Sequence, residues 1–192
     1  MVQYGVLFKE EGFEKMHQDI DKILLSQKEI EEKAVELAEQ LKVDYADKKP
    51  ILLGLLKGST MFMADLMKSL DIDLQIDFMD VSSYDGTAST GDVKIVKDLD
   101  VSVRGRHVLI AEDIVDTGRT LEKVIELLKS RGAATVEMVT LLDKPEARVA
   151  PIAAKYVGFT IPKSFVVGYG LDYNEKYRNL PYIGILKESV YS

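Results

Sequence analysis

Two adjacent carboxylates follow an apolar run near the middle of the chain. Residues 108–111, Val-Leu-Ile-Ala, suit a strand buried on both faces of a parallel sheet, and Glu112 and Asp113 come directly after them. Residues 116–120, Asp-Thr-Gly-Arg-Thr, then form a turn before a helical pattern begins. Backbone N–H groups in such a turn can bind a phosphate, and the carboxylates can hold hydroxyls or a hard cation such as Mg²⁺. The stretch predicts a site for a phosphorylated sugar.

A second turn of this kind follows an earlier apolar strand. Residues 51–56, Ile-Leu-Leu-Gly-Leu-Leu, lead into Lys57-Gly58-Ser59-Thr60 and then into a helical pattern. Together they form a strand–loop–helix unit whose turn is suited to an anion. Taken alone, an ordinary tight turn with a solvated lysine is the simpler interpretation.

A loop of small polar residues lies between two strand-like segments. Residues 74–84 alternate in side-chain type and end at Ser82-Ser83-Tyr84, and residues 93–99 resume strand character. Residues 85–92 contain one alanine and no larger apolar side chain, so this segment cannot bury itself and is predicted to be a mobile loop. The pattern predicts a hairpin whose tip is either a lid over a site or an ordinary exposed loop.

The remaining segments supply helices and strands around these turns. Residues 11–25 carry apolar side chains at helical spacing and predict a first helix, with a stripe of Phe13, Met16, Ile20 and Ile23/Leu24. Ser26 followed by Glu29 is a capping-box signature, which predicts the start of a second helix. Further elements are expected over four segments: a helix over 121–132 and strands over 135–142, 157–161 and 165–168.

Strands alternating with helices predict an α/β fold, with a central, mostly parallel twisted sheet and helices on both faces. Ligands of such sheets bind beyond the carboxyl ends of the strands. Lys57, Tyr84, the stretch from Glu112 to Thr120, and Lys144 all follow predicted strands, so we expect them to meet at that edge. This convergence favours a functional role for the lysine at 57 and for the polar loop.

The composition argues against several classes of protein. With 192 residues, of which 46% are hydrophobic, one domain of ordinary size is expected. The chain has no cysteine, which excludes disulfides and thiolate metal sites and favours a cytoplasmic location. The apolar runs are too short to cross a membrane, and no signal peptide is expected. The net charge of −7 argues against a nucleic-acid-binding surface.

Residues 108–121 resemble the phosphoribosyl-pyrophosphate-binding signature of the type I phosphoribosyltransferases. That signature is specific: an apolar strand, an acid pair, two apolar residues, and then Asp-Thr-Gly-Lys/Arg-Thr. Other stretches make nearly the whole chain similar to the hypoxanthine-guanine members of this family, namely Leu56-Lys57-Gly58-Ser59, Ser83-Tyr84, Lys144, Phe165-Val166, residues 171–175 and Arg178. Two positions depart from the family's pattern, because Arg119 stands where many members have lysine and Ser59 replaces a glycine seen in some relatives.

The resemblance implies an enzyme of purine salvage. Such an enzyme transfers the 5-phosphoribosyl group from phosphoribosyl pyrophosphate to N9 of hypoxanthine or guanine, gives IMP or GMP plus pyrophosphate, and requires Mg²⁺. The resemblance also implies a single phosphoribosyltransferase domain over residues 1–192, with a core over about 27–170. A small hood would be formed by the N-terminal segment and about 162–192. A homodimer or homotetramer is expected, without nucleic-acid or membrane partners.

The resemblance assigns the sugar and its phosphate to the central motif. The turn would bind the 5-phosphate through backbone N–H groups and two hydroxyls, with Thr117, Gly118, Arg119 and Thr120 as the residues concerned. Glu112 and Asp113 would hold the ribose hydroxyls, either directly or through Mg²⁺. Their negative charge would lie where a ribooxocarbenium-like transition state develops positive charge.

The purine base is assigned to residues after three of the strands. Asp116 would be the general base or acid at purine N7, although its position also suits a helix N-cap. Lys144 would donate to the 6-oxo group, which implies a preference for 6-oxopurines over adenine. Phe165 would stack on the base and the Val166 backbone would bond to it, although residue type alone does not separate stacking from burial of Phe165 in the core.

The resemblance assigns the pyrophosphate to the turn after residues 51–56 and to the C-terminal segment. Asp172 would bind a second Mg²⁺ with the pyrophosphate, and Arg178 would bind its oxygens through the planar fork of the guanidinium. Lys57 and Gly58 would contact pyrophosphate through the loop backbone, with a cis peptide expected between Leu56 and Lys57. Finally, Ser83 and Tyr84 would close over the site and exclude water.

Two alternatives to this function stay open. The first is a xanthine-specific or broad 6-oxopurine phosphoribosyltransferase, because selection at purine C2 rests on backbone carbonyls around Val166 and Asp172. The second is a regulator that senses phosphoribosyl pyrophosphate and binds nucleic acid. The acidic net charge, together with Lys144 and Phe165, favours the enzyme.

Overall fold

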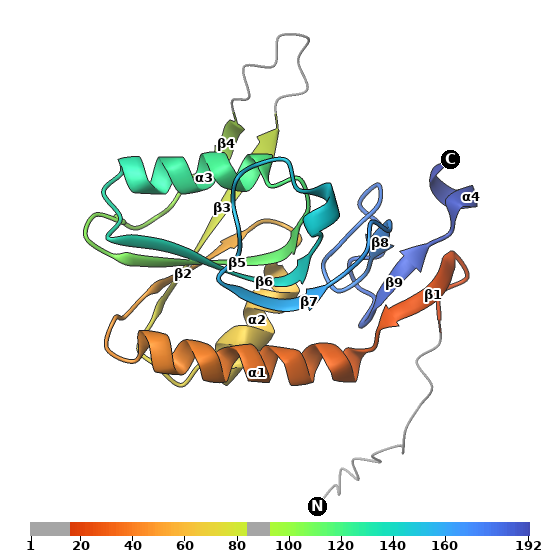
Figure 1. Cartoon of the computed structure of the whole chain (residues 1–192), viewed down its shortest axis with the longest axis horizontal. Coiled ribbons are helices and arrows are strands. Elements are labelled where there is room, and N and C mark those ends of the chain that lie inside the picture. Colours follow the sequence, from red (N-terminus) through yellow and green to blue (C-terminus); the bar gives the residue numbers. More distant parts are fainter. Residues whose placement is uncertain (1–15, 84–92) are drawn as a thin grey trace, which may run out of the picture.

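The computed structural model of the protein describes residues 16–83 and 93–192. Figure 1 shows a sheet with helices on both faces and, beside it, a smaller sheet. The elements in chain order are β1 (Ile20–Leu25), α1 (Gln27–Tyr45), β2 (Ile51–Leu55), α2 (Thr60–Ser69), β3 (Gln75–Ser83), β4 (Val93–Lys97), β5 (His107–Val115), α3 (Arg119–Ser130), β6 (Thr135–Asp143), the 3₁₀ turn η1 (Pro145–Ala147), β7 (Tyr156–Thr160), β8 (Val166–Val167), β9 (Ile183–Leu186) and α4 (Glu188–Tyr191).

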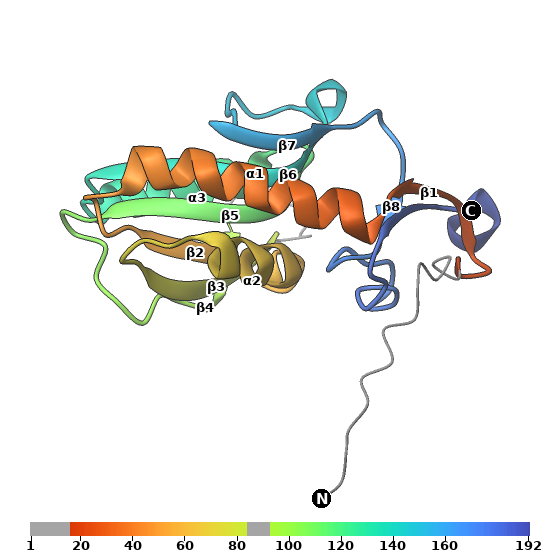
Figure 2. The same cartoon turned by 90° about the horizontal axis from the view of Figure 1, so that it is seen from below.

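The central sheet has six strands in the order β4-β3-β2-β5-β6-β7. Five strands of this sheet, β3, β2, β5, β6 and β7, pair in parallel with their neighbours. The edge strand β4 pairs antiparallel with β3. The helices α1 and α2 cover one face and α3 covers the other (Figures 1 and 2). The predicted α/β fold with a mostly parallel sheet is confirmed.

The core divides between the two faces of the sheet because side chains alternate along each strand. Leu52 of β2 and Leu109 of β5 pack in the cluster that contains the apolar sides of α1 and α2. Ile51 and Val108, one residue earlier on the same strands, pack in the cluster that contains the apolar side of α3. A sheet covered on both faces needs apolar residues at successive positions, which explains the continuous apolar runs in the sequence.

The capping box predicted at the start of α1 is present. The Ser26 side chain accepts a hydrogen bond from the Glu29 N–H at 3.3 Å, and the Glu29 carboxylate accepts one from the Ser26 N–H at 2.8 Å. These contacts occupy two of the backbone donors that a helix start leaves unpaired. The chain therefore turns at a defined point from β1 into the long helix that covers the sheet.

The prediction of a helix over residues 11–25 is wrong for all of its described part: residues 16–19 are not helical, and residues 20–25 form β1. This strand pairs antiparallel with β9 in a three-stranded sheet of order β1-β9-β8, called the small sheet below. Its register shifts twice, between Ile20 and Lys22 and between Ile23 and Leu25, and such bulges break the two-residue alternation that identifies a strand. Residues 11–15 of the expected helix lie outside the described residues.

The hairpin predicted after residue 74 is confirmed in its strands. β3 and β4 pair antiparallel, with Asp80 opposite Lys97 and Ser83 opposite Val93. Residues 84–92, which include Tyr84 and the polar loop, lie outside the described residues, so their role as a lid stays a prediction. In the described parts of the chain, no helix has the length and apolar character that crossing a membrane requires.

Candidate active site

Glu112 and Asp113 lie near the carboxyl end of β5, at the edge of the central sheet that faces the small sheet (Figure 1). Asp113 is buried and accepts a hydrogen bond from the Ile114 N–H at 2.8 Å. Glu112 Oε2 is also buried and has no hydrogen-bond partner among the described residues. A buried oxygen without a partner is costly, so the pair is suited to bind a polar ligand.

Both carboxyl groups are difficult to ionise where they lie. Burial raises the pKa of Glu112 well above its usual value, and the neighbouring charge of Asp113 adds to the increase. Burial also raises the pKa of Asp113 to about 6, against the opposing effect of the hydrogen bond from the Ile114 N–H. A cation or a set of hydroxyl donors at this point would favour the ionised forms.

Residues 148–150 fix the turn that follows β5. Arg148 donates from Nη2 to the Val115 carbonyl at 3.0 Å and from Nε to the Asp116 carbonyl at 2.9 Å. The Thr117 carbonyl accepts two backbone N–H groups of the same segment, at 2.9 and 3.0 Å. In a trans peptide the C=O and the following N–H point in opposite directions. The N–H groups of residues 116–118, which follow these three carbonyls, therefore point away from residues 148–150. Successive donors aimed to one side are what an anion site requires.

The helix α3 begins directly after this turn, with Gly118 as its N-cap residue. No side chain caps the helix, so the alternative that Asp116 is an N-cap is wrong. Gly118 has a φ of +80°, and a Cβ there would lie 3.0 Å from the Ile152 side chain, so conformation and space both favour glycine. The predicted phosphate residues Arg119 and Thr120 form the first turn of α3, where the helix dipole favours an anion.

Arg148 is a supporting residue that the sequence patterns did not identify. Its side chain is only 14% exposed, and beyond the two carbonyls of the turn it contacts the Asp143 carboxylate and donates from Nη1 to the Ile152 carbonyl at 2.8 Å. A planar fork with five donors suits this set of acceptors, whereas a lysine does not. The only signal in the sequence was its place shortly after the end of a predicted strand.

The turn after β2 lies between the acid pair and a second glycine. The Leu56–Lys57 peptide bond is cis, as predicted. A Cβ at Gly58 would lie 1.9 Å from Asp113 Oδ2, and a Cβ at Gly170 would lie 2.0 Å from the Gly58 carbonyl oxygen. Glycine at both positions therefore allows the turn, the acid pair and the segment after β8 to meet at one point.

Asp172 and Arg178 pair within the segment that follows Gly170. Arg178 Nη2 lies 2.8 Å from Asp172 Oδ1, and its Nη1 donates to the Gly170 carbonyl at 2.7 Å. The other oxygen of Asp172 accepts the Glu175 N–H at 2.9 Å, and the Glu175 carboxylate pairs with Lys57 Nζ at 3.0 Å. The residues assigned to pyrophosphate are thus linked to one another by ion pairs and hydrogen bonds.

Lys144 and Asp116 come together at the ends of two neighbouring strands. β5 and β6 are paired up to Val115 and Asp143, so the next residue on each strand lies beside the other. Lys144 Nζ lies 3.5 Å from Asp116 Oδ2, with the lysine side chain 9% exposed and the aspartate side chain 48% exposed. An ammonium has three donors, so Lys144 keeps donors for a further acceptor.

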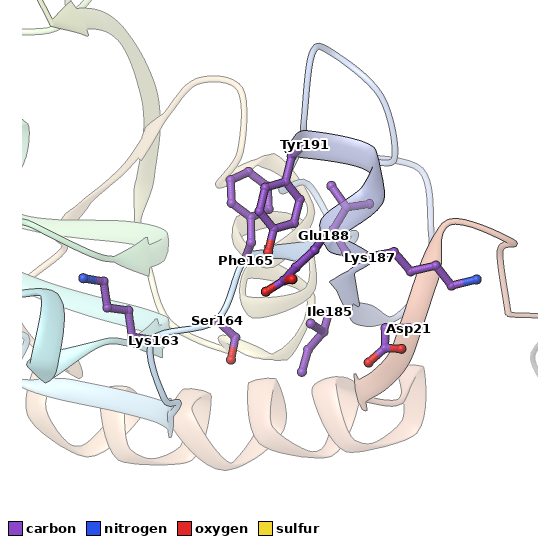
Figure 3. Close-up of a pocket in the computed structure, with 9 residues that line it drawn as sticks. Asp21, Lys163, Ser164, Phe165, Ile185, Lys187, Glu188 and Tyr191 are labelled. Atoms are coloured by element: carbon purple, nitrogen blue, oxygen red, sulfur yellow. The ribbon is translucent and has the colours of Figure 1, made fainter.

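Phe165 does not belong to the core, so the interpretation as a core residue is wrong, and stacking on a base stays a prediction. The residue is 39% exposed. Its ring stacks on that of Tyr191 (Figure 3) and also lies against Tyr173. It lines a cavity of about 480 Å³, which no other predicted site residue borders within the part of the chain that the structure describes. A second cavity, of about 660 Å³, lies beside Arg178. Val166, by contrast, is buried in β8 and pairs with Ile185 of β9.

The described residues contain no group of three or more acidic or histidine side chains that could hold a metal ion by themselves. The carboxylates assigned to Mg²⁺ are distributed instead, with Glu112 and Asp113 on β5 and Asp172 after β8. Glu112 Oε2 lacks a hydrogen-bond partner within residues 16–83 and 93–192, so the acid pair offers an oxygen ligand. Mg²⁺ commonly takes one or two carboxylates and completes its shell with substrate oxygens and water, and these residues fit that mode.

A family model describes the same part of the chain. Residues 21–174 match the phosphoribosyl transferase domain, and this range contains the acid pair, both turns and Asp172. The chain therefore belongs to the phosphoribosyl transferase domain family.

Several relatives are similar to the chain over most of its length. The hypoxanthine-guanine phosphoribosyltransferase of Bacillus subtilis (strain 168) is 56% identical over 177 residues, which cover 92% of this chain and 98% of that protein. A crystal structure of a hypoxanthine phosphoribosyltransferase from Staphylococcus aureus has a TM-score of 0.89 and 57% identity, over 92% of this chain and 97% of that one. The predicted similarity to the hypoxanthine-guanine members of the family is confirmed.

One relative is much longer than this chain. The bifunctional protein TilS/HprT of Listeria innocua is 58% identical over 182 residues, which cover 94% of this chain but only 28% of that protein. This chain therefore matches one part of a two-function protein.

Proposed function

We propose that this chain transfers the 5-phosphoribosyl group from phosphoribosyl pyrophosphate to N9 of hypoxanthine or guanine, which yields IMP or GMP and pyrophosphate in purine salvage. One observation carries the proposal. A Cβ on Gly58 would overlap the Asp113 carboxylate, and a Cβ on Gly170 would overlap the Gly58 carbonyl oxygen. The turn suited to pyrophosphate, the acid pair suited to ribose and the segment of Asp172 and Arg178 therefore surround one point, where the bond between ribose and pyrophosphate would break.

The sugar donor would span this point. The N–H groups of the turn after β5 would bind its 5-phosphate, and Glu112 with Asp113 would accept hydrogen bonds from the ribose hydroxyls. Arg178 and the backbone at Lys57 and Gly58 would bind the pyrophosphate as it departs. The carboxylates would lie where positive charge develops on the sugar, and preorganised charge of this kind is a major source of rate enhancement.

The base would be recognised by the pair of Lys144 and Asp116. The 6-oxo oxygen and N7 of a purine lie side by side on one edge of the base. Lys144 Nζ and Asp116 Oδ2 are 3.5 Å apart, which suits a donor to the oxygen and a proton-transfer group at N7. Adenine has an amino group in place of the oxygen, so Lys144 would face a donor there. Phe165, with its exposed ring, would stack on the base.

Mg²⁺ would bind between the protein and the donor, with Asp172 and the acid pair as the carboxylates within reach of the substrate. When bound, it neutralises charge on the pyrophosphate leaving group. Asp172 would exchange part of its present pairing with Arg178 and the Glu175 N–H for the ion. Glu112 needs no such exchange for Oε2, because that oxygen has no hydrogen-bond partner among the described residues.

The assembly and location follow from the resemblance and are part of the proposal. A cytoplasmic homodimer or homotetramer is expected, and size-exclusion chromatography with light scattering measures the number of subunits.

A spectrophotometric assay with four bases tests the function. Hypoxanthine, guanine, xanthine and adenine are each mixed with phosphoribosyl pyrophosphate and Mg²⁺, and nucleotide formation is followed. We expect activity with hypoxanthine and guanine. Activity with xanthine at a comparable rate would indicate a broad 6-oxopurine enzyme, and activity with adenine alone would contradict the role of Lys144. A filter-binding test with RNA and DNA at moderate salt separates the enzyme from a nucleic-acid-binding regulator.

A further inference from the structure

The ring of Phe165 is held by two tyrosines from other parts of the chain. Tyr191 stacks on it with ring centroids 4.9 Å apart and an interplanar angle of 21°. Tyr173 meets it edge-on, with centroids 5.6 Å apart and an angle of 88°, and the two tyrosines are themselves 6.5 Å apart. Figure 3 shows the stacked pair of Phe165 and Tyr191 at the side of α4. These three rings form an aromatic cluster. Phe165 and Tyr191 belong to none of the three apolar core clusters, and Tyr173 packs against one of them.

The position of Tyr191 is set independently of Phe165. The helix α4 is anchored at Lys187, whose N–H donates to the Asp19 carbonyl at 3.0 Å and whose Nζ donates to the Gln18 carbonyl at 2.6 Å. Val190, the neighbour of Tyr191, packs against the apolar cluster of the small sheet. Tyr191 is therefore fixed to the entry of β1, and it offers Phe165 a stationary surface.

The backbone of Phe165 is also fixed, although its side chain is not part of the buried core. Its carbonyl accepts the Leu186 N–H at 3.0 Å, which ties it to β9. Tyr191 stacks on one face of the ring, the residue remains 39% exposed, and among the described residues no second ring stacks on the opposite face. An aromatic face held open in this way offers a stacking surface to a planar ligand.

We propose that Tyr191 is a positioning residue for the purine base: it braces Phe165 from behind, so that the base stacks on the open face of a ring that is already ordered. This inference rests on the proposed function, because that function supplies the base. The brace removes rotamer freedom of Phe165 before binding, and a preorganised contact surface binds more tightly than one that must be ordered by the ligand. Tyr191 contacts the ring and not the base.

The test compares Tyr191→Ala with Tyr191→Phe, which keeps the ring and removes the hydroxyl. We expect Tyr191→Ala to raise KM for hypoxanthine by about 2- to 12-fold, which corresponds to the loss of one aromatic pair. KM for phosphoribosyl pyrophosphate should stay within about twofold, and Tyr191→Phe should resemble the unmodified protein. Glu188→Ala, on the same helix and without loss of an aromatic ring, is the matched control. A decrease of KM for hypoxanthine would mean that Tyr191 covers the stacking face, and an unchanged KM would mean that it has no role; either result overturns the proposal.

A second measurement does not depend on catalysis. The chain has six phenylalanines, so selective ¹³C labelling of their rings gives few signals, and Phe165→Leu identifies the one of interest. We expect the order parameter of the Phe165 ring to fall in Tyr191→Ala and to be retained in Tyr191→Phe. If the unmodified protein formed no nucleotide, the proposed function would be wrong. The order parameter of the Phe165 ring would still show whether Tyr191 orders that ring. An equally ordered ring in Tyr191→Ala would overturn the brace even in an active enzyme.

Discussion

Arg148 donates from Nε to the backbone carbonyl of Asp116 at 2.9 Å, so the residue proposed to move a proton is held by a partly buried guanidinium on a different segment. The same fork holds the preceding carbonyl, of Val115, and contacts the Asp143 carboxylate at the end of the neighbouring strand. The turn after β5 is therefore fixed through its carbonyls, which leaves its N–H groups on the side proposed for the substrate.

Replacing Arg148 by lysine should weaken binding of the sugar phosphate. A lysine keeps the charge beside Asp143 but cannot reach three carbonyls at once, so the turn loses its fixed conformation. We expect the free energy of unfolding to fall by about 1–3 kcal/mol and KM for phosphoribosyl pyrophosphate to rise roughly tenfold, a difference of about 1.4 kcal/mol. Steady-state kinetics and urea unfolding of the Arg148→Lys variant measure the two effects.

Arg131→Lys is the matched control for that variant. Arg131 also pairs with a carboxylate through both Nη atoms, with Asp98 at 2.6 and 2.7 Å, but the pair lies at the surface. An exposed pair contributes less than about 1 kcal/mol, so this variant should keep its KM. If Arg148→Lys lost stability but kept its KM, Arg148 would support the fold without organising the phosphate turn.

Asp116→Asn should separate binding from chemistry. The asparagine keeps the shape and leaves the phosphate turn intact, but it cannot accept the proton from purine N7. We expect the dissociation constant for phosphoribosyl pyrophosphate to stay the same and turnover to fall at least about tenfold. A positioned proton-transfer group contributes about 10²–10⁴-fold, and residual catalysis by the rest of the site makes the measured loss smaller. Isothermal titration calorimetry and the nucleotide assay measure these quantities, and Asp47→Asn at an exposed turn is the control. Weaker binding with unchanged turnover of bound substrate would contradict the role in proton transfer.

The parts of the site that sequence predicted are those whose signals are local. The apolar runs of β2 and β5 require a sheet covered on both faces. The acids lie in the last part of β5, which continues to Val115 and not only to Ala111 as expected, and the glycines and Lys144 come shortly after strand ends. Arg148 and Tyr191 were not predicted, because their partners are backbone carbonyls and a distant ring that leave no pattern in the sequence. The helix expected at residues 20–25 failed for a related reason: the pairing of β1 with β9 joins distant segments and overrides local periodicity.

Gly58→Ala should abolish the approach of the pyrophosphate turn to the acid pair. The added Cβ would lie 1.9 Å from Asp113 Oδ2, and Asp113 is buried, so the carboxylate or the turn has to move. We expect kcat/KM for phosphoribosyl pyrophosphate to fall at least about tenfold, because misplacing a reacting group by about 1 Å can lower the reaction rate by about 10²-fold.

Gly105→Ala separates this contact from the general cost of replacing a glycine. Gly105 has a φ of +69° and open space around its Cβ position, so alanine there costs about 1 kcal/mol of backbone strain and nothing at the site. We expect lower stability and unchanged kcat/KM. Equal kcat/KM for the Gly58→Ala variant and the unmodified protein would show that the turn and Asp113 are not in contact during turnover.

Asp113→Asn should change how stability depends on pH in the metal-free protein. The pKa of Asp113 is raised to about 6 from a usual value near 4, chiefly by burial. Between about pH 4 and pH 6 the folded state then holds a proton that the unfolded state has lost, so the free energy of unfolding falls as the pH rises. The decrease attributable to Asp113 is at most about 3 kcal/mol, and the asparagine variant, which keeps the shape but does not titrate, should lack it. Urea unfolding at pH 4, 5, 6 and 7 measures the difference between the two proteins, which cancels the titration of other carboxylates. A difference that stays constant over this range would mean that Asp113 ionises normally in the fold.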